Sequence, residues 1–324
     1  MRTKKLGYTD LNLTVIGLGT WAIGGGSYGW GWGPQDDKES IVTIREALEE
    51  GVNWIDTAPA YGLGRSEKVV GEAIKGLRDK VIIATKCGSV WDKGTDLFGR
   101  LKKESIRQEV ENSLRRLNID VIDFYQIHWP DPAEDIEEAW SVIADLIKEG
   151  KIRYGGVSNF SVAQIKRVQP IHPVASLQPP YSLIRREIEV DLLGYCATNK
   201  IGVIVYSPLQ SGLFTGKFTR DNIKNLPADD WRRDKSGFFQ EPQLTANLEL
   251  VENLRVLAEK KGRTVAQLAI AWTLRRPEVT AAIVGARHPG QIKETIKAGD
   301  WVLNENEITA VEELLKKRLF KLNR

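Results

Sequence analysis

The feature that most constrains this chain is a regular alternation of short apolar segments and longer amphipathic ones. Some short segments, such as residues 81–84 and 203–205, are apolar at every position, which is typical of strands covered on both faces. Eight short β-branched runs occur, at residues 14–18, 53–56, 80–85, 120–127, 152–157, 173–177, 202–206 and 280–284. Eight strands that alternate with helices predict an α/β fold, a (β/α)8 TIM barrel.

The segments between these runs carry helix signals. Residues 37–50 open with acidic side chains and end at Gly51, and residues 103–117 place apolar side chains on one face. Further helices are expected at 133–148, 187–199, 244–261 and 264–275, after Ser161 and near Pro289.

Three pieces are expected in addition to the barrel. Residues 4–7 and 11–13 predict an N-terminal β-hairpin, and residues 207–242 form a long insertion between the seventh and eighth strands. The extra C-terminal helices end with residues 305–317, which we expect to lie over one end of the barrel. Because no Pro-, Gly- or Ser-rich linker divides the sequence, we expect residues 1–324 to form a single domain.

Composition argues against several classes of protein. The 46 Lys and Arg and 43 Asp and Glu residues are interspersed, so we expect no nucleic-acid partner. Two cysteines cannot build a disulfide framework, and three histidines without a His-x-x-x-His pair indicate no metal site. No apolar run approaches the ~18 residues of a membrane span, so we expect a cytoplasmic protein without a membrane partner.

Polar residues follow three successive predicted strands. Asp56 ends the second run and Tyr61 lies five residues later, Lys86 directly follows the third run, and His128 directly follows the fourth. Because catalytic groups of such barrels lie at the C-terminal ends of strands, we expect these four side chains at one opening.

These residue types suit acid–base chemistry. A buried Lys86 requires a partner such as Asp56, since an isolated buried charge is costly. A neighbouring ammonium would lower the pKa of Tyr61 from about 10, so that the phenol could protonate a developing alkoxide.

Each residue also has another interpretation. Asp56 could cap a loop, His128 could be a core residue, and Lys86 could be an exposed strand-end lysine or the Schiff-base lysine of a class I aldolase. Pairing with Asp56 argues against the aldolase, because it keeps the ammonium protonated. The combination of four residues at three strand ends favours a functional site.

The segments Trp54–Gly62, Ala84–Lys86 and Gln126–His128 resemble the Asp, Tyr, Lys and His tetrad of the aldo-keto reductase superfamily. Residues 151–160 most resemble its bacterial general-stress and potassium-channel-β-like branches. The resemblance implies an NAD(P)H-dependent oxidoreductase that reduces small aldehydes and ketones to alcohols on a barrel. It also leaves open a cofactor-sensing regulatory protein with incidental turnover.

The resemblance assigns a role to each member of the tetrad. Tyr61 would be the general acid, Lys86 would lower its pKa, Asp56 would hold Lys86, and His128 would orient the substrate carbonyl.

A nicotinamide cofactor also fits the chemistry of the later strand ends. Ser158, Asn159 and Gln178 could bind a carboxamide, and Tyr206 offers a ring for stacking. By resemblance Arg287 could take a 2′-phosphate, which favours NADP, with NADPH preferred over NADH. The residues expected around the cofactor are Gly19, Thr20, Trp21, Asp56, Ser158, Asn159, Gln178, Tyr206, Ser207, Pro208, Leu209, Ser211, Gly212, Lys217, Gly285, Arg287, Gln291, Glu294 and Thr295.

Two further features concern the loops at the strand ends. Residues 17–22 fit a loose dinucleotide-binding fingerprint, but Gly24, Gly25 and Gly26 follow where that motif needs a helix, so we reject it. Tryptophans in the strand-end loops predict an aromatic substrate pocket. The residues expected there are Trp21, Trp30, Trp32, Tyr61, Trp91, His128 and Trp129, with Trp231 nearby.

Overall fold

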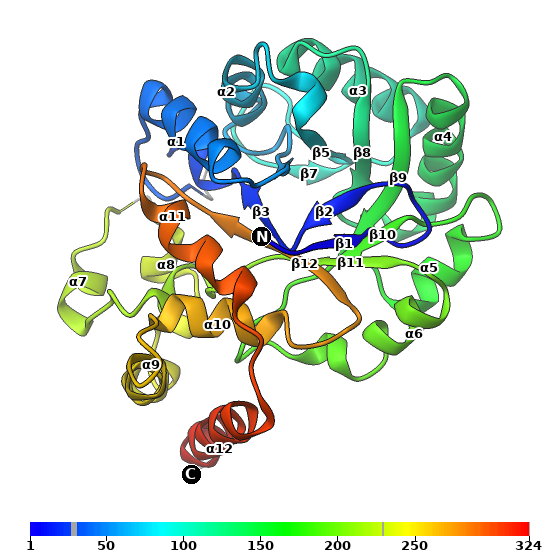
Figure 1. Cartoon of the computed structure of the whole chain (residues 1–324). Coiled ribbons are helices and arrows are strands. Elements are labelled where there is room, and N and C mark those ends of the chain that lie inside the picture. The colour runs from blue at the N-terminus through cyan, green and yellow to red at the C-terminus, as the bar shows by residue number, and fades with distance from the viewer. Residues whose placement is uncertain (27–30, 229, 324) are drawn as a thin grey trace.

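Eight parallel strands form a closed barrel in this computed structural model, which describes residues 1–26, 31–228 and 230–323 (Figure 1). The strands lie within or closely overlap the eight predicted runs, so the prediction of a TIM barrel is confirmed. In chain order they are β3 (Ile16–Gly19), β4 (Trp54–Asp56), β5 (Ile82–Cys87), β8 (Ile122–Ile127), β9 (Ile152–Ser158), β10 (Ser176–Gln178), β11 (Gly202–Val205) and β12 (Val279–Gly285).

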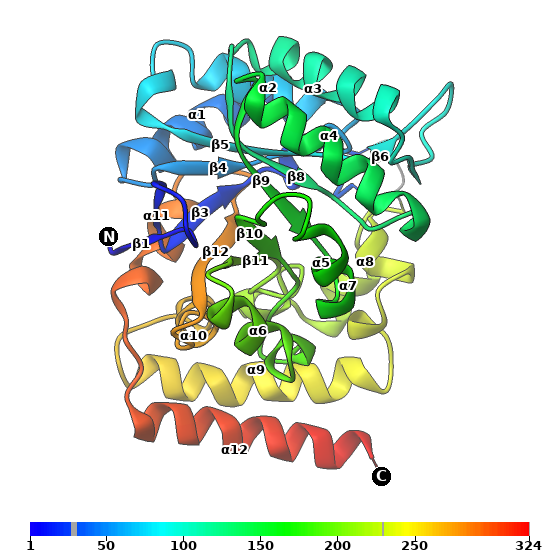
Figure 2. The same cartoon turned by 90° about the vertical axis from the view of Figure 1, so that its right-hand side faces the viewer.

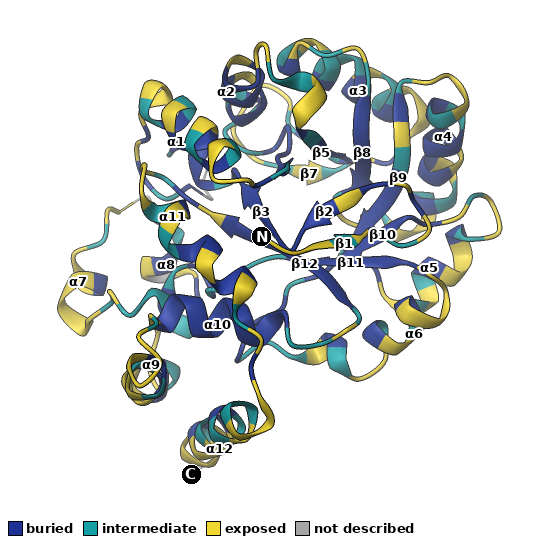
Figure 3. Ribbon diagram, in the orientation of Figure 1, coloured by how far each residue is buried: buried dark blue, intermediate teal, exposed yellow. Residues whose placement is uncertain are grey.

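Helices surround the barrel and turn their apolar faces to the strands (Figure 3). They are α1 (Asp37–Glu49), α2 (Arg65–Ala73), α3 (Lys103–Leu117), α4 (Ile136–Lys148), α5 (Val162–Val168), α6 (Leu192–Thr198), α10 (Val265–Thr273) and α11 (Gln291–Thr295). Helix α2 was not predicted. It begins after Gly64, which has φ 91° and offers no capping side chain, so its start carries no N-cap signal.

The predicted N-terminal hairpin is present and closes one end of the barrel. Strands β1 (Thr3–Lys5) and β2 (Asn12–Thr14) cross the barrel opening in Figure 1. Leu6 and Leu13 from this hairpin pack with Trp54 and Phe124 in one buried cluster. A ligand site therefore has to open at the other end, where the strands finish.

Close packing inside the barrel explains the glycine at position 17. A Cβ atom added there would lie 2.0 Å from Cε2 of Trp54. The indole is fixed, because Trp54 Nε1 donates a hydrogen bond of 2.9 Å to the Thr14 carbonyl. Gly17 therefore makes room for an indole.

The last helix does not lie over the end of the barrel, so that expectation was wrong. Helix α12 (Glu305–Leu322) runs beside α9 (Gln243–Glu259) along the flank (Figure 2). The contact buries Val311 and Leu315, and Arg318 Nε donates to Asn247 Oδ1 at 2.6 Å. The side chains that face α9 thus set the position of α12.

Two loops after strands carry structure of their own. The expected insertion between β11 and β12 contains α7 (Arg220–Lys224) and α8 (Trp231–Asp234). The loop after β5 forms a small hairpin of β6 (Ser89–Val90) and β7 (Phe98–Gly99), which is too short for the sequence to reveal. In the described part of the chain, no helix has both the length and the apolar character needed to cross a bilayer.

Candidate active site

The structure brings the four predicted tetrad residues together at the open end of the barrel. Asp56, Lys86 and His128 come from or directly follow the adjacent strands β4, β5 and β8, and Tyr61 lies in the turn after β4. Lys86 Nζ lies 2.6 Å from Asp56 Oδ1 and 3.2 Å from the Tyr61 hydroxyl. The Tyr61 and His128 rings meet edge to face, with centroids 5.9 Å apart.

The ammonium of Lys86 is fully buried, and all of its N–H groups are hydrogen-bonded. Besides Asp56 and Tyr61, it donates to the Thr57 carbonyl at 3.0 Å. These contacts occupy all three of its N–H groups. An ammonium held in this way is not a free nucleophile, so the geometry does not support the Schiff-base alternative.

A second set of hydrogen bonds fixes the other oxygen of Asp56. Gln178 Nε2 donates to Asp56 Oδ2 at 2.8 Å, and Gln126 Nε2 lies 3.4 Å from the same atom. Gln178 also donates to Gln126 Oε1 at 3.2 Å. Strands β8 and β10 thus orient the carboxylate that holds Lys86.

The environment changes the pKa values of the tetrad. Burial lowers the pKa of Lys86, although Asp56 opposes this effect. Burial and the nearby Lys86 charge hold the pKa of His128 well below 6.5, so its imidazole is neutral at neutral pH.

The expectation for Tyr61 was wrong in direction. Burial and the negative charge of Asp56 raise the pKa of Tyr61 well above 10.0. Removing the phenolate from water outweighs the attraction of Lys86, because desolvation penalises the charged form. Tyr61 is therefore a protonated hydrogen-bond donor across the neutral range.

A cavity of about 900 Å³ opens beside the tetrad. Asp56, Tyr61 and His128 line it, whereas Lys86 lies behind them. Every residue expected around the cofactor is among the lining residues, from Gly19 on β3 to Thr295 on α11. The size suits a large organic ligand.

Most of the expected aromatic residues line this cavity. Trp21, Trp32 and Trp129 do so together with Trp231. Trp91 does not, because it lies at the turn between β6 and β7, and Leu97 and Phe98 reach the cavity instead. Trp30 lies outside the described residues.

Comparison with known proteins agrees with this arrangement. The sequence model of the Aldo/keto reductase family matches residues 15–316. The chain belongs to this family. The resemblance inferred from the tetrad motifs is thereby confirmed, and this aldo-keto reductase is an oxidoreductase.

Relatives of this aldo-keto reductase match over nearly their full length. Aldo-keto reductase YhdN of Bacillus subtilis is 44% identical over 95% of this chain and 92% of its own. The NADH-specific methylglyoxal reductase of Escherichia coli is 38% identical over 97% of this chain and 98% of its own. The solved structure of a glycerol dehydrogenase from Gluconobacter oxydans is 40% identical, with a TM-score of 0.88 over 98% of this chain and 96% of that one.

Residues after β9, β10 and β11 fix one another at the wall of the aldo-keto reductase cavity. Ser158 Oγ donates to the Gln178 carbonyl at 2.8 Å, and Asn159 Nδ2 donates to the His128 carbonyl at 3.0 Å. The Tyr206 hydroxyl donates to Asn159 Oδ1 at 2.9 Å. Asn159 adopts φ 62°, a left-handed conformation that is common near functional sites.

The loop after β11 offers backbone donors. Ser207, Gln210 and Ser211 all have positive φ values, of 57°, 45° and 56°. Within the described chain, the N–H groups of Leu209, Ser211 and Gly212 make no hydrogen bond, although these residues line the cavity. Free N–H groups that line a cavity can bind phosphate oxygens.

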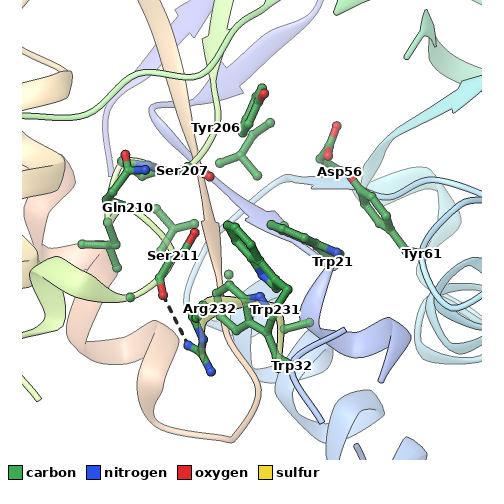
Figure 4. Close-up of a pocket in the computed structure, with 18 of the residues that line it drawn as sticks. Trp21, Trp32, Asp56, Tyr61, Tyr206, Ser207, Gln210, Ser211, Trp231 and Arg232 are labelled. Atoms are coloured by element: carbon green, nitrogen blue, oxygen red, sulfur yellow. Dashed lines mark hydrogen bonds between the residues drawn. The ribbon is translucent and has the colours of Figure 1, made fainter. Parts of the chain in front are cut away.

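Arg232 lines the cavity but was not predicted to do so. It pairs with Asp230 at 2.5 Å, its guanidinium lies 4.4 Å from the Trp32 ring centroid, and it reaches the Ser211 carbonyl at 3.3 Å (Figure 4). No motif surrounds this arginine in the insertion, so only the fold reveals its place.

Arg287 is partly occupied by the first loop. Its three nitrogens donate to Gln35 Oε1 at 2.8 Å, the Trp32 carbonyl at 2.8 Å and the Pro34 carbonyl at 2.6 Å. A guanidinium has five N–H groups, so two remain. Arg287 thus ties residues 32–35 to the start of α11 and retains donors for a ligand.

Three tryptophans from two loops meet across the cavity. The ring centroid of Trp21 lies 5.7 Å from that of Trp32 and 5.8 Å from that of Trp231. In Figure 4, Asp56 and Tyr61 lie on one side of this cluster, and Ser211 and Arg232 lie on the other. The cavity therefore has an acid–base end and a cationic end with free backbone donors.

Proposed function

We propose that this aldo-keto reductase reduces aldehydes and ketones to alcohols, with NADPH as the hydride donor and Tyr61 as the general acid. The observation that carries the proposal is the 3.2 Å contact between the Tyr61 hydroxyl and an ammonium whose other N–H groups are taken by Asp56 and Thr57. The phenol is fixed at the cavity wall with a positive charge beside its oxygen.

The cavity suits a nicotinamide dinucleotide, which when bound supplies hydride to the carbonyl carbon. The free N–H groups of Leu209, Ser211 and Gly212, together with Lys217 and Arg232, would hold its diphosphate. Ser158, Asn159 and Gln178 would meet the carboxamide, and Tyr206 would face the ring.

The side chains of the tetrad handle the proton. The neutral His128 donates a hydrogen bond to the carbonyl oxygen and so aligns the carbonyl with the Tyr61 hydroxyl. As negative charge develops on that oxygen, Tyr61 gives up its proton to it. The Lys86 ammonium stabilises the phenolate that forms, because its attraction to Tyr61 is strongest once the oxygen carries a negative charge. Water reprotonates Tyr61 after the alcohol leaves.

The preference for NADPH rests on Arg287. Arg287 lines the cavity together with Gln291, Glu294 and Thr295, and two of its N–H groups remain after its bonds to Gln35, Trp32 and Pro34. A 2′-phosphate there would gain a charge-assisted hydrogen bond that NADH lacks, worth about 1.5–3 kcal/mol.

The test compares Tyr61→Phe with the wild type. We expect the variant to lose carbonyl reduction while its tryptophan fluorescence is still quenched by NADPH at similar concentrations. Tyr8→Phe is the matched control, because Tyr8 lies in the hairpin at the closed end of the barrel. Full activity in Tyr61→Phe would refute the role of the phenol. Equal affinity of the wild type for NADPH and NADH would refute the role of Arg287.

A further inference from the structure

Among the described residues, the cavity wall includes an arginine side chain that pairs with no other group. Arg185, in the segment between β10 and α6, lines the cavity. In the described part of the chain, its side chain makes no hydrogen bond or ion pair. The next residue, Arg186, differs, because it bonds Glu189 at 2.8 Å and Glu312 at 2.6 Å. Arg186 therefore stabilises the fold, whereas Arg185 contributes an uncompensated charge.

Arg185 belongs to the acid–base end of the cavity. Tyr181 N–H donates to the Tyr206 carbonyl at 3.1 Å, and Arg185 N–H donates to the Ser182 carbonyl at 3.2 Å, so the turn that carries Arg185 lies beside the end of β11. In agreement with this position, the charge of Arg185 opposes the rise that burial causes in the pKa of Tyr206. Tyr206 in turn bonds Asn159, which bonds the backbone of His128. We assign the cofactor diphosphate to the backbone N–H groups of the loop after β11 together with Lys217 and Arg232, which leaves Arg185 available for another anion.

The nearby acidic residues do not neutralise Arg185. Asp56 is paired with Lys86, and the described part of the chain shows no ion pair between Glu294 and Arg185. Asp131 lines the mouth and is exposed, and it lies outside ion-pair distance of Arg185. A guanidinium in a cavity with aromatic walls strongly favours an anionic ligand, since its planar N–H groups match carboxylate and phosphate oxygens.

We propose that Arg185 binds an anionic group of the substrate, so that the preferred substrates are aldehydes or ketones that carry a carboxylate or a phosphate. This inference rests on the proposed carbonyl reduction. The anionic group would sit at Arg185 while the carbonyl oxygen meets Tyr61 and His128. Binding at two points would fix which face of the carbonyl is presented.

The experiment measures kcat/KM with NADPH for matched charged and neutral substrates. Succinic semialdehyde is compared with its amide, 4-carboxybenzaldehyde with 4-formylbenzamide, and glyceraldehyde 3-phosphate with glyceraldehyde. We expect the charged member of at least one pair to be favoured by about 10- to 100-fold, as for a charge-assisted hydrogen bond. The first two pairs report on a carboxylate and the third on a phosphate.

Two variants test the residue itself. Arg185→Gln should abolish the preference and leave kcat/KM for the neutral members unchanged, and Arg185→Lys should retain part of it. An absence of preference in all three pairs would overturn the inference, as would an equal loss for charged and neutral members in Arg185→Gln. Reduction of the neutral aldehydes would still support the proposed function. If no carbonyl compound is reduced, both the proposed function and the inference about Arg185 are refuted.

Discussion

Glu109 provides a pH-dependent test of the structure. This residue of α3 is 8% exposed, accepts a hydrogen bond of 2.8 Å from the Gly88 N–H, and accepts another of 3.0 Å from Ser105 Oγ. Burial raises the pKa of its carboxyl group from 4.5 to about 7, although Arg100 and Arg116 oppose the rise. Replacement by Gln removes the charge and can keep both hydrogen bonds.

The expected magnitude follows from the two pKa values. The step from 4.5 to about 7, at about 1.4 kcal/mol per pH unit, gives about 3 kcal/mol. Because the folded state binds this proton more tightly than the unfolded state, stability falls as pH rises through this window. The destabilisation is about 1 kcal/mol at pH ~5 and reaches about 3 kcal/mol at pH ~9.

The assay is urea unfolding of the wild type and Glu109→Gln, followed by tryptophan fluorescence at both pH values. We expect the variant to gain about 2 kcal/mol relative to the wild type between pH ~5 and pH ~9. If the stability difference between the two proteins is the same at both pH values, Glu109 titrates normally and the reasoning is wrong.

Two further outcomes are expected. The value of kcat for carbonyl reduction should stay nearly constant between about pH 6 and about pH 9. The reason is that the pKa of Tyr61 lies well above 10.0 and the pKa of His128 lies well below 6.5. A change of kcat near neutral pH that disappears in Tyr61→Phe would contradict this. Gly17→Ala should destabilise the protein by about 1–3 kcal/mol or more in urea unfolding, because its Cβ would lie 2.0 Å from the fixed Trp54 ring. An unchanged urea midpoint would show that the ring can move.

Much of the barrel could be predicted because its signals are local. Strands covered on both faces appear as apolar runs, and α3 has the predicted bounds of 103 and 117 because its apolar face and its ends are visible in the sequence. Helix α2 lacks a capping side chain, and the position of α12 depends on a contact with α9, so neither could be predicted from local pattern.

The candidate site divides in the same way. Asp56, Tyr61, Lys86 and His128 could be found because strand ends of a barrel share one opening. Arg185 and Arg232 could not, because nothing in their local sequence reports which of many arginines turns into a cavity or lacks a partner. The pKa of Tyr61 could not be predicted either, since desolvation depends on how deeply the folded chain buries the phenol.

The shared hydrogen bonds of Asp56 have a consequence for altering this enzyme. One oxygen of the carboxylate accepts a hydrogen bond from Lys86, and the other accepts one from the Gln178 side chain. The backbone carbonyl of Gln178 in turn accepts a hydrogen bond from Ser158. The acid–base groups and the part of the cavity wall that we propose for the nicotinamide therefore belong to one hydrogen-bonded network. A designer who changes Gln178 to retune cofactor choice will shift the ammonium beside Tyr61 as well, so the two properties have to be selected together.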